Sequence, residues 1–165
     1  MDEAKLIRVL KSLPLFAKNF LIIHDKSGAE KQFVMNRAQL YVHERLEAQL
    51  NATGKVRALI LKGRQQGIST LIQARFFHKI ITKRGKKAFI LTHLSDATSA
   101  IFEMTKRYSE NIDAALFPQP DKKNDNKLTY DGLGSGYRVG TAGSAEIGRR
   151  NPPRRKKRDK LGRPG

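Results

Sequence analysis

The feature that most constrains this chain is the stretch of residues 58–70. Four apolar residues suited to a β-strand, 58–61, lead into a polar turn with two glycines, and an apolar-rich helical segment, 71–81, follows. Strand, glycine turn and helix in this order build a phosphate-binding loop, because the free N–H groups and the dipole at the helix start both favour an anion. The order predicts an anion site around Gly67 and Ser69.

The turn matches the Walker A pattern G-x-x-x-x-G-K-[ST] only in part. Gly67 and Ser69 fit, but Lys62 stands at the first glycine and Ile68 stands at the lysine. A phosphate loop needs a cation, and Arg64 is the candidate because a guanidinium can hold phosphate oxygens with two hydrogen bonds. The Ser69 hydroxyl is placed to hold Mg²⁺. The alternative is an ordinary strand-to-helix turn with a basic surface.

The rest of the pattern indicates an α/β fold. A strand, helix, strand, helix order implies a parallel sheet with helices packed on it. The expected elements before the loop are a helix over 3–12 that stops at Ser12–Pro14, a hairpin of strands 20–23 and 31–35, and a helix that starts at Asn36, runs through Leu50 and stops near residues 51–54, where Gly54 lies. After strand 58–61 and helix 71–81 come a strand over 88–92, a helix capped by Ser95, a polar loop over 117–126, and a glycine-turned hairpin of 127–130 with 137–141.

Asn36 and Gln39 have the spacing of a capping box at a helix start. The Gln39 amide also offers one donor and one acceptor, which suits the edge of an adenine. Without further support, the capping role is the simpler interpretation.

Charge is the dominant global property. The 165 residues carry a net charge of +18, and residues 149–165 alone carry +8, with nine Arg or Lys and one acid, Asp159. A basic body with a more basic tail favours a polyanion partner, with nucleic acid first and a membrane surface second. The plain alternative is a basic protein whose charge is simply solvated. Because the tail has three prolines and one aliphatic residue, we expect it to be disordered.

Several chemistries are excluded or disfavoured. The chain has no Cys, so disulfides, thiolate metal sites and cysteine nucleophiles are excluded. Its four His residues lack metal-ligand spacing, and no paired carboxylates follow an apolar strand after the turn. We therefore nominate no catalytic residue. We see no secretory signal and no apolar run of about 18 residues, so we expect a cytoplasmic location.

Several motifs in order resemble the ATPase half of a tailed-phage terminase large subunit, the motor that packages viral DNA. The resemblance rests on Phe33–Gln39, on Arg64-Gln-Gln-Gly-Ile-Ser-Thr70, on strand 89–93, and on Gly136–Gly143 with Gly148-Arg149. It spans roughly residues 1–149. The family accepts deviant phosphate loops, so the resemblance implies that Arg64 is the phosphate cation and that Gln39 contacts adenine.

The resemblance implies ATP and Mg²⁺ as cofactors, with Ser69 as a metal ligand. It implies double-stranded DNA, the small terminase subunit and the portal protein as partners, in the host cytoplasm if the chain is phage-encoded, and no membrane. The implied nucleotide-binding residues are Gln39, Arg64, Gln65, Gln66, Gly67, Ile68, Ser69 and Thr70.

The chain also departs from the family. Family members continue after Gly-Arg with an apolar strand that ends in Asp-Glu and with a nuclease domain, and neither is present here. At Arg150 the sequence changes abruptly to Arg, Lys and Pro. We interpret this as a truncation, most simply by a frameshift near Arg149, or alternatively as a genuine basic arm.

The sequence thus predicts a partial P-loop three-layer αβα sandwich with a parallel sheet, preceded by a small helix and hairpin. We expect three parts: residues 1–35, an ATPase portion over 36–148, and the tail 149–165. The expected function is that of a terminase ATPase fragment that does not hydrolyse ATP alone. The alternatives are another P-loop translocase on nucleic acid, or a non-catalytic basic nucleic-acid binder.

Overall fold

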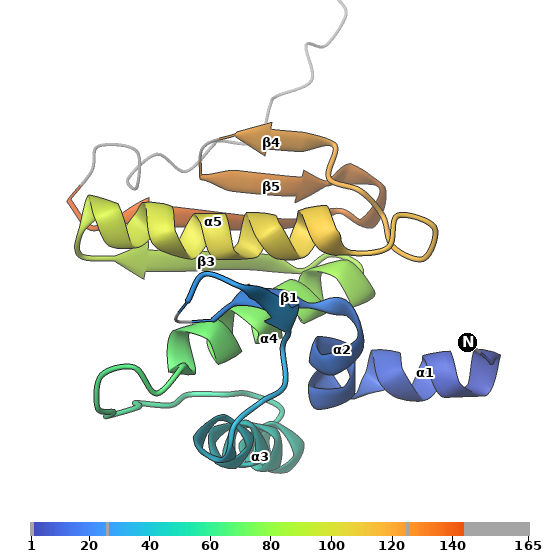
Figure 1. Cartoon of the computed structure of the whole chain (residues 1–165), viewed down its shortest axis with the longest axis horizontal. Coiled ribbons are helices and arrows are strands. Elements are labelled where there is room, and N and C mark those ends of the chain that lie inside the picture. Colours follow the sequence, from blue (N-terminus) through green and yellow to red (C-terminus); the bar gives the residue numbers. More distant parts are fainter. Residues whose placement is uncertain (1, 26, 125, 144–165) are drawn as a thin grey trace, which may run out of the picture.

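The computed structural model describes residues 2–25, 27–124 and 126–143; the expected tail 149–165 and the Gly148-Arg149 pair lie outside this part. Along the described chain, two helices, a two-stranded hairpin and two more helices are followed by a strand, a helix and three further strands (Figure 1). The helices are α1 Glu3–Lys11, α2 Leu13–Phe20, α3 Arg37–Thr53, α4 Ile68–Thr82 and α5 Ser95–Asn111, with a short 3₁₀ turn at Asp131–Leu133. The strands are β1 Ile22–His24, β2 Glu30–Gln32, β3 Lys87–Thr92, β4 Lys122–Asn124, β5 Lys127–Tyr130 and β6 Ser135–Thr141.

The main sheet has four strands in the order β3-β6-β5-β4. Strands β3 and β6 run parallel, with Phe89 opposite Arg138, while β5 pairs antiparallel with both β6 and β4. Strands β1 and β2 form a separate antiparallel hairpin. Helices α4 and α5 both pack on β6, and α5 runs along the sheet in Figure 1. The class is therefore mixed α/β, with one parallel pair in the main sheet.

Helix α4 packs against α2, α3, α5 and the main sheet and supplies several side chains to the core. Its buried face repeats at helical spacing through Leu71, Ala74, Phe77 and Ile81, which is why this segment is a helix packed on two sides. Each fully buried side chain of this size contributes about 1.5–3 kcal/mol relative to exposure. The aromatic side chains of the sheet complete the core, and Tyr137 is 1% exposed.

The expected strand over 58–61 is wrong: these residues form no strand and pair with no other described segment. Leu59 and Leu61 are 101% and 100% exposed. A strand needs a ladder partner and a cover on each buried face, and apolar β-branched composition alone supplies neither. Strand β3 pairs with β6 on one side, and its other edge has no partner among the described residues. The segment runs in the same direction as β3 in Figure 1.

Other expectations fared better. The helix from Asn36, the glycine stop at Gly54, strand β3 and the β5–β6 hairpin are confirmed. The end of the first helix at Ser12–Pro14 is confirmed, since α1 ends at Lys11 with Ser12 as its C-cap, but a second helix that was not expected, α2, starts at Leu13. Ser12 caps α2 through the Leu15 N–H, and Pro14 lies in the first turn, where no intrahelical N–H is needed.

Two further details differ. Ser95 is the first residue of α5, and its N-cap is Leu94, which makes no side-chain cap bond. The polar loop expected over 117–126 contains the short edge strand β4. Among the described residues, no helix has both the length and the apolar character to cross a bilayer.

Candidate anion-binding loop

The loop before α4 has a backbone conformation that few residues adopt. Gln65 has φ of 59° and Gly67 has φ of 70°, both in the left-handed region. Gly67 is the N-cap of α4 and makes no side-chain cap bond, so the N–H groups of the first helical turn have no capping partner from it. The first helical hydrogen bond runs from the Leu71 N–H to the Gly67 carbonyl, at 3.1 Å. The helix start can therefore present free N–H donors to an anion.

Gln39 fixes this loop in place. Its Nε2 donates to the Gly67 carbonyl at 2.7 Å, and its Oε1 accepts from the Asn36 backbone N–H at 2.9 Å. The side chain is buried, with the residue 4% exposed. A Cβ on Gly67 would lie 2.6 Å from the Gln39 Nε2, so the close approach requires glycine.

Asn36 adds a second tie between α3 and the loop. Its Oδ1 accepts from the Gln39 N–H at 2.9 Å, which completes the capping box, and its Nδ2 donates to the Gln66 carbonyl at 3.4 Å. The start of α3 and the start of α4 are thus locked together by side-chain amides. The capping interpretation of Asn36 and Gln39 is confirmed.

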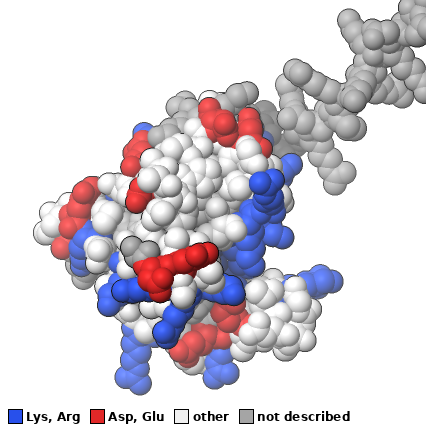
Figure 2. Space-filling model, turned by 90° about the vertical axis from the view of Figure 1, so that its right-hand side faces the viewer, with Lys and Arg blue, Asp and Glu red and all other residues white. Residues whose placement is uncertain are grey.

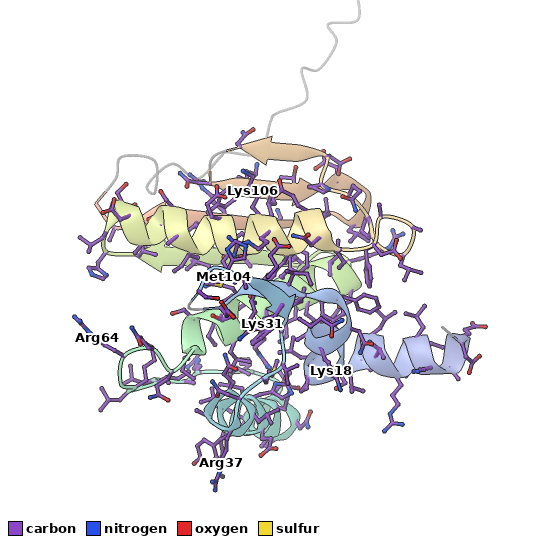
Figure 3. All side chains as sticks on the ribbon, viewed as in Figure 1. Lys18, Lys31, Arg37, Arg64, Met104 and Lys106 are labelled. Atoms are coloured by element: carbon purple, nitrogen blue, oxygen red, sulfur yellow. The ribbon has the colours of Figure 1, made fainter. Side chains whose placement is uncertain are left out.

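Most of the residues predicted to bind nucleotide lie together in the loop before α4 and in its first turn, and most of their side chains are exposed to solvent. Arg64 lies at the tip of the loop and extends away from the body of the molecule in Figure 3. Gln65, Gln66 and Ser69 are exposed, whereas Ile68 is buried beneath the first turn of α4. Thr70 is half-buried. A mobile cation at the loop tip can close over a bound anion, while Ile68 anchors the helix.

A groove of about 750 Å³ lies between the start of α3 and the extended segment. The side chains that line it include Arg37, Tyr41, Leu61 and Gln66. Gln39 does not line this groove, and its amide oxygen and one amide hydrogen are already hydrogen-bonded to protein. The residues available to a planar base beside the loop are therefore Tyr41, which is exposed, and Arg37.

Sequence reasoning did not select Arg37 or Tyr41. The signal that could have found them is their position: both lie within the first turns of the helix whose cap holds the loop. Tyr41 also stacks under a cation, with the Arg45 guanidinium carbon 5.2 Å from its ring centre. An aromatic residue that is exposed beside a phosphate loop suits stacking on a base.

No known family model matches the chain, and no curated protein shows significant similarity to it. The site must therefore be interpreted from its own geometry. The described residues contain no group of three or more His, Asp or Glu side chains arranged to hold a metal ion. Ser69, as the second residue of α4, has its side chain exposed at the helix start.

Cationic side chains surround this region. Lys62 and Arg64 are exposed on the loop, and Arg37 is exposed at the start of α3. Figure 3 shows Arg37 and Arg64 extending outward from different sides of this end of the molecule. On another face, Figure 2 shows a strip of Lys and Arg side chains along one edge, while further basic side chains lie beside acidic ones elsewhere on that face. The local charge favours a polyphosphate over a neutral ligand.

Proposed function

We propose that this chain is the ATP-binding half of a terminase-like DNA-packaging ATPase. The observation that carries the proposal is the uncapped start of α4, where a left-handed Gly67 is held by Gln39 and flanked by basic residues. The order of sequence motifs around that loop supports the same function. Both features concern phosphate binding, which is the shared requirement of this class of enzymes.

In the proposed complex, the N–H groups of Ile68 and Ser69 hold phosphate oxygens, and Arg64 neutralises their charge from the loop tip. The Ser69 hydroxyl would hold Mg²⁺, which would supply positive charge to neutralise the phosphates. The free hydrogen of the Gln39 amide is its remaining donor toward adenine, and Tyr41 offers a stacking surface in the neighbouring groove. The residues of the loop fit a nucleotide, and they offer one ligand for Mg²⁺, the Ser69 hydroxyl.

We propose that this chain binds ATP without hydrolysing it. Hydrolysis needs a carboxylate to orient water and a second magnesium ligand, and no described acidic side chain lines the groove beside the loop. The outer edge of β3 has no partner among the described residues, so a further parallel strand could pair there. The apolar segment 58–61 is exposed, so its side chains are also free to pack against added residues. A strand placed there would end beside the start of α4, where those carboxylates are needed.

Nucleotide binding tests the proposal directly. A fluorescent ATP analogue titrated into the purified chain with Mg²⁺ should bind. Arg64→Ala should weaken binding by about 10- to 150-fold, as expected for loss of a charge-assisted contact of about 1.5–3 kcal/mol. Arg8→Ala is the matched control, because Arg8 is an exposed arginine on α1, outside the loop. Equal affinities for the Arg64 and Arg8 variants would refute the assignment of Arg64.

Hydrolysis is measured on the same samples by phosphate release. We expect no Arg64-dependent turnover. A turnover rate that disappears in Arg64→Ala would show that this chain carries a complete site.

A second candidate is a non-catalytic nucleic-acid binder, favoured by the net charge of +18. In that case the affinity for double-stranded DNA should fall steeply with salt and should be lost on removal of residues 149–165, with no effect of ATP. An ATP-dependent change in DNA affinity would favour the motor fragment instead. The small terminase subunit and the portal protein are partners of the first proposal alone.

A further inference from the structure

A second cavity, of about 820 Å³, lies between α1, α3, α4 and the loop that follows α5. None of residues 62–70 lines it, so it is separate from the proposed nucleotide site. Its volume lies within the usual range for small-molecule sites. In Figure 1, α3 lies below α4, and α1 lies on the side of the molecule away from the loop that leads into α4.

One wall of this cavity is apolar. Leu10 on α1, Leu50 on α3, Ile81 on α4 and Phe117 after α5 all line it. Phe117 also packs against Phe16 with ring centres 5.7 Å apart, which fixes its position. Three helices and the loop after α5 therefore contribute apolar lining suited to a hydrocarbon group.

The lining of the same cavity also includes cationic side chains. Lys11, Arg75, Lys79 and Lys83 line it, against one lining carboxylate, Glu47. The excess of cations is costly in a partly desolvated space. Burial, followed by repulsion from Arg75, lowers the pKa of Lys79. A bound anion would relieve this repulsion.

Arg75 is the buried centre of the cluster. Its side chain is 6% exposed, and its Nη1 pairs with the Glu47 carboxylate. Its Nη2 is buried without a hydrogen-bond partner in the described structure. A guanidinium that donates to a carboxylate through one nitrogen, and has a second nitrogen without a hydrogen-bond partner, can donate to a second oxyanion.

The two histidines that line the cavity do not add charge. Burial is the main cause that lowers the pKa of both His43 and His78, so both are neutral near pH 7. The His78 Nε2 lies 2.8 Å from the Leu10 carbonyl and donates its hydrogen to it, which ties α4 to α1. The positive charge of the site therefore comes from the lysines and Arg75.

We propose that this cavity binds a small amphipathic oxyanion, with its charged head at Arg75 and Lys79 and its apolar body against Leu10, Leu50 and Phe117. A carboxylate and a phosphate monoester share this chemistry. The proposal does not depend on nucleotide binding at the α4 loop, because the two sites share no residue.

Calorimetric titration with octanoate, octyl phosphate, inorganic phosphate and octan-1-ol tests the site. We expect at least one of the two amphiphiles to bind, with inorganic phosphate and octan-1-ol at least tenfold weaker. The preference between octanoate and octyl phosphate identifies the head group. The absence of binding by either amphiphile at millimolar concentration would overturn the proposal, as would equal binding of octan-1-ol or inorganic phosphate.

Substitution locates the binding. Lys79→Gln should weaken binding of the amphiphile at least fivefold while leaving the Arg75–Glu47 pair intact. Lys18→Gln is the matched control, because Lys18 is an exposed lysine on α2 that does not line the cavity. Far-UV circular dichroism of both variants confirms that they are folded. An equal effect of the two substitutions would place the binding elsewhere and overturn the proposal.

Discussion

The contact between Gly67 and Gln39 gives a sharp test of how the loop is held. Gly67→Ala adds a Cβ that would lie 2.6 Å from the Gln39 Nε2 and 3.3 Å from its Cδ. A separation of 2.6 Å is too short for two such atoms, so the buried amide must move. Its hydrogen bonds to the Gly67 carbonyl and to the Asn36 N–H are then lost or weakened.

The magnitude follows from two contributions. An alanine in the left-handed region costs about 1–2 kcal/mol. Loss of two buried hydrogen bonds costs about 1 kcal/mol each. We expect Gly67→Ala to lower the free energy of unfolding by about 3–4 kcal/mol, measured by urea denaturation followed by circular dichroism.

Gly54→Ala is the control because it isolates the backbone contribution. Gly54 has φ of 67°, close to that of Gly67, but no atom lies within 4 Å of its added Cβ. We expect a loss of only about 1–2 kcal/mol. In a Gln39→Ala background, the loss of free energy of unfolding caused by Gly67→Ala should also be only this smaller amount, because the side-chain amide that the new Cβ would contact is absent. Equal effects of Gly54→Ala and Gly67→Ala in the wild-type background would refute the reasoning.

Three further predictions concern stability. Leu59→Ser should change the free energy of unfolding by less than about 0.5 kcal/mol, since Leu59 is fully exposed, whereas Leu71→Ala in the core should lower it by about 2–5 kcal/mol. A large effect of Leu59→Ser in urea denaturation would mean that segment 58–61 is packed. Glu47→Ala should lower the free energy of unfolding by about 2 kcal/mol, because it leaves Arg75 buried without its carboxylate partner. This value lies between those for exposed and buried ion pairs. Adding Arg75→Met should recover part of this loss in the same assay. Because burial lowers the pKa of His78, the unfolded chain binds a proton at a higher pH than the folded chain does. The free energy of unfolding should therefore fall as the pH drops below about 6.5 and level off below the folded pKa. Urea midpoints measured from about pH 7.5 to 5 should fall less in His78→Gln than in the wild type, and identical pH profiles would contradict this role of His78.

The local features of the fold were predictable because they depend on neighbouring residues. The capping box of Asn36 and Gln39, the glycine end of α3 and the amphipathic face of α4 all follow from spacings of three or four residues. The β5–β6 hairpin follows from glycine turn chemistry. In each case the stabilising contact lies close in the sequence.

The failures share one physical cause, which is dependence on a distant partner. Residues 58–61 have strand composition, but whether a strand forms depends on a neighbouring ladder, and none pairs with them in the described structure. The bond from Gln39 to Gly67 spans 28 residues, and the Arg75–Glu47 pair likewise joins two helices. No local spacing indicates such contacts.

The sequence by itself determined the α/β class, the glycine loop before α4 and the strong positive charge. These follow from residue type and short-range order, which act without reference to the rest of the fold. Only the tertiary structure decided that the segment entering the loop is unpaired, that Gln39 is committed to the loop, and that Arg75 is buried beside a second cavity. Burial and hydrogen-bond partners are properties of the packed chain, because each depends on which elements meet in space.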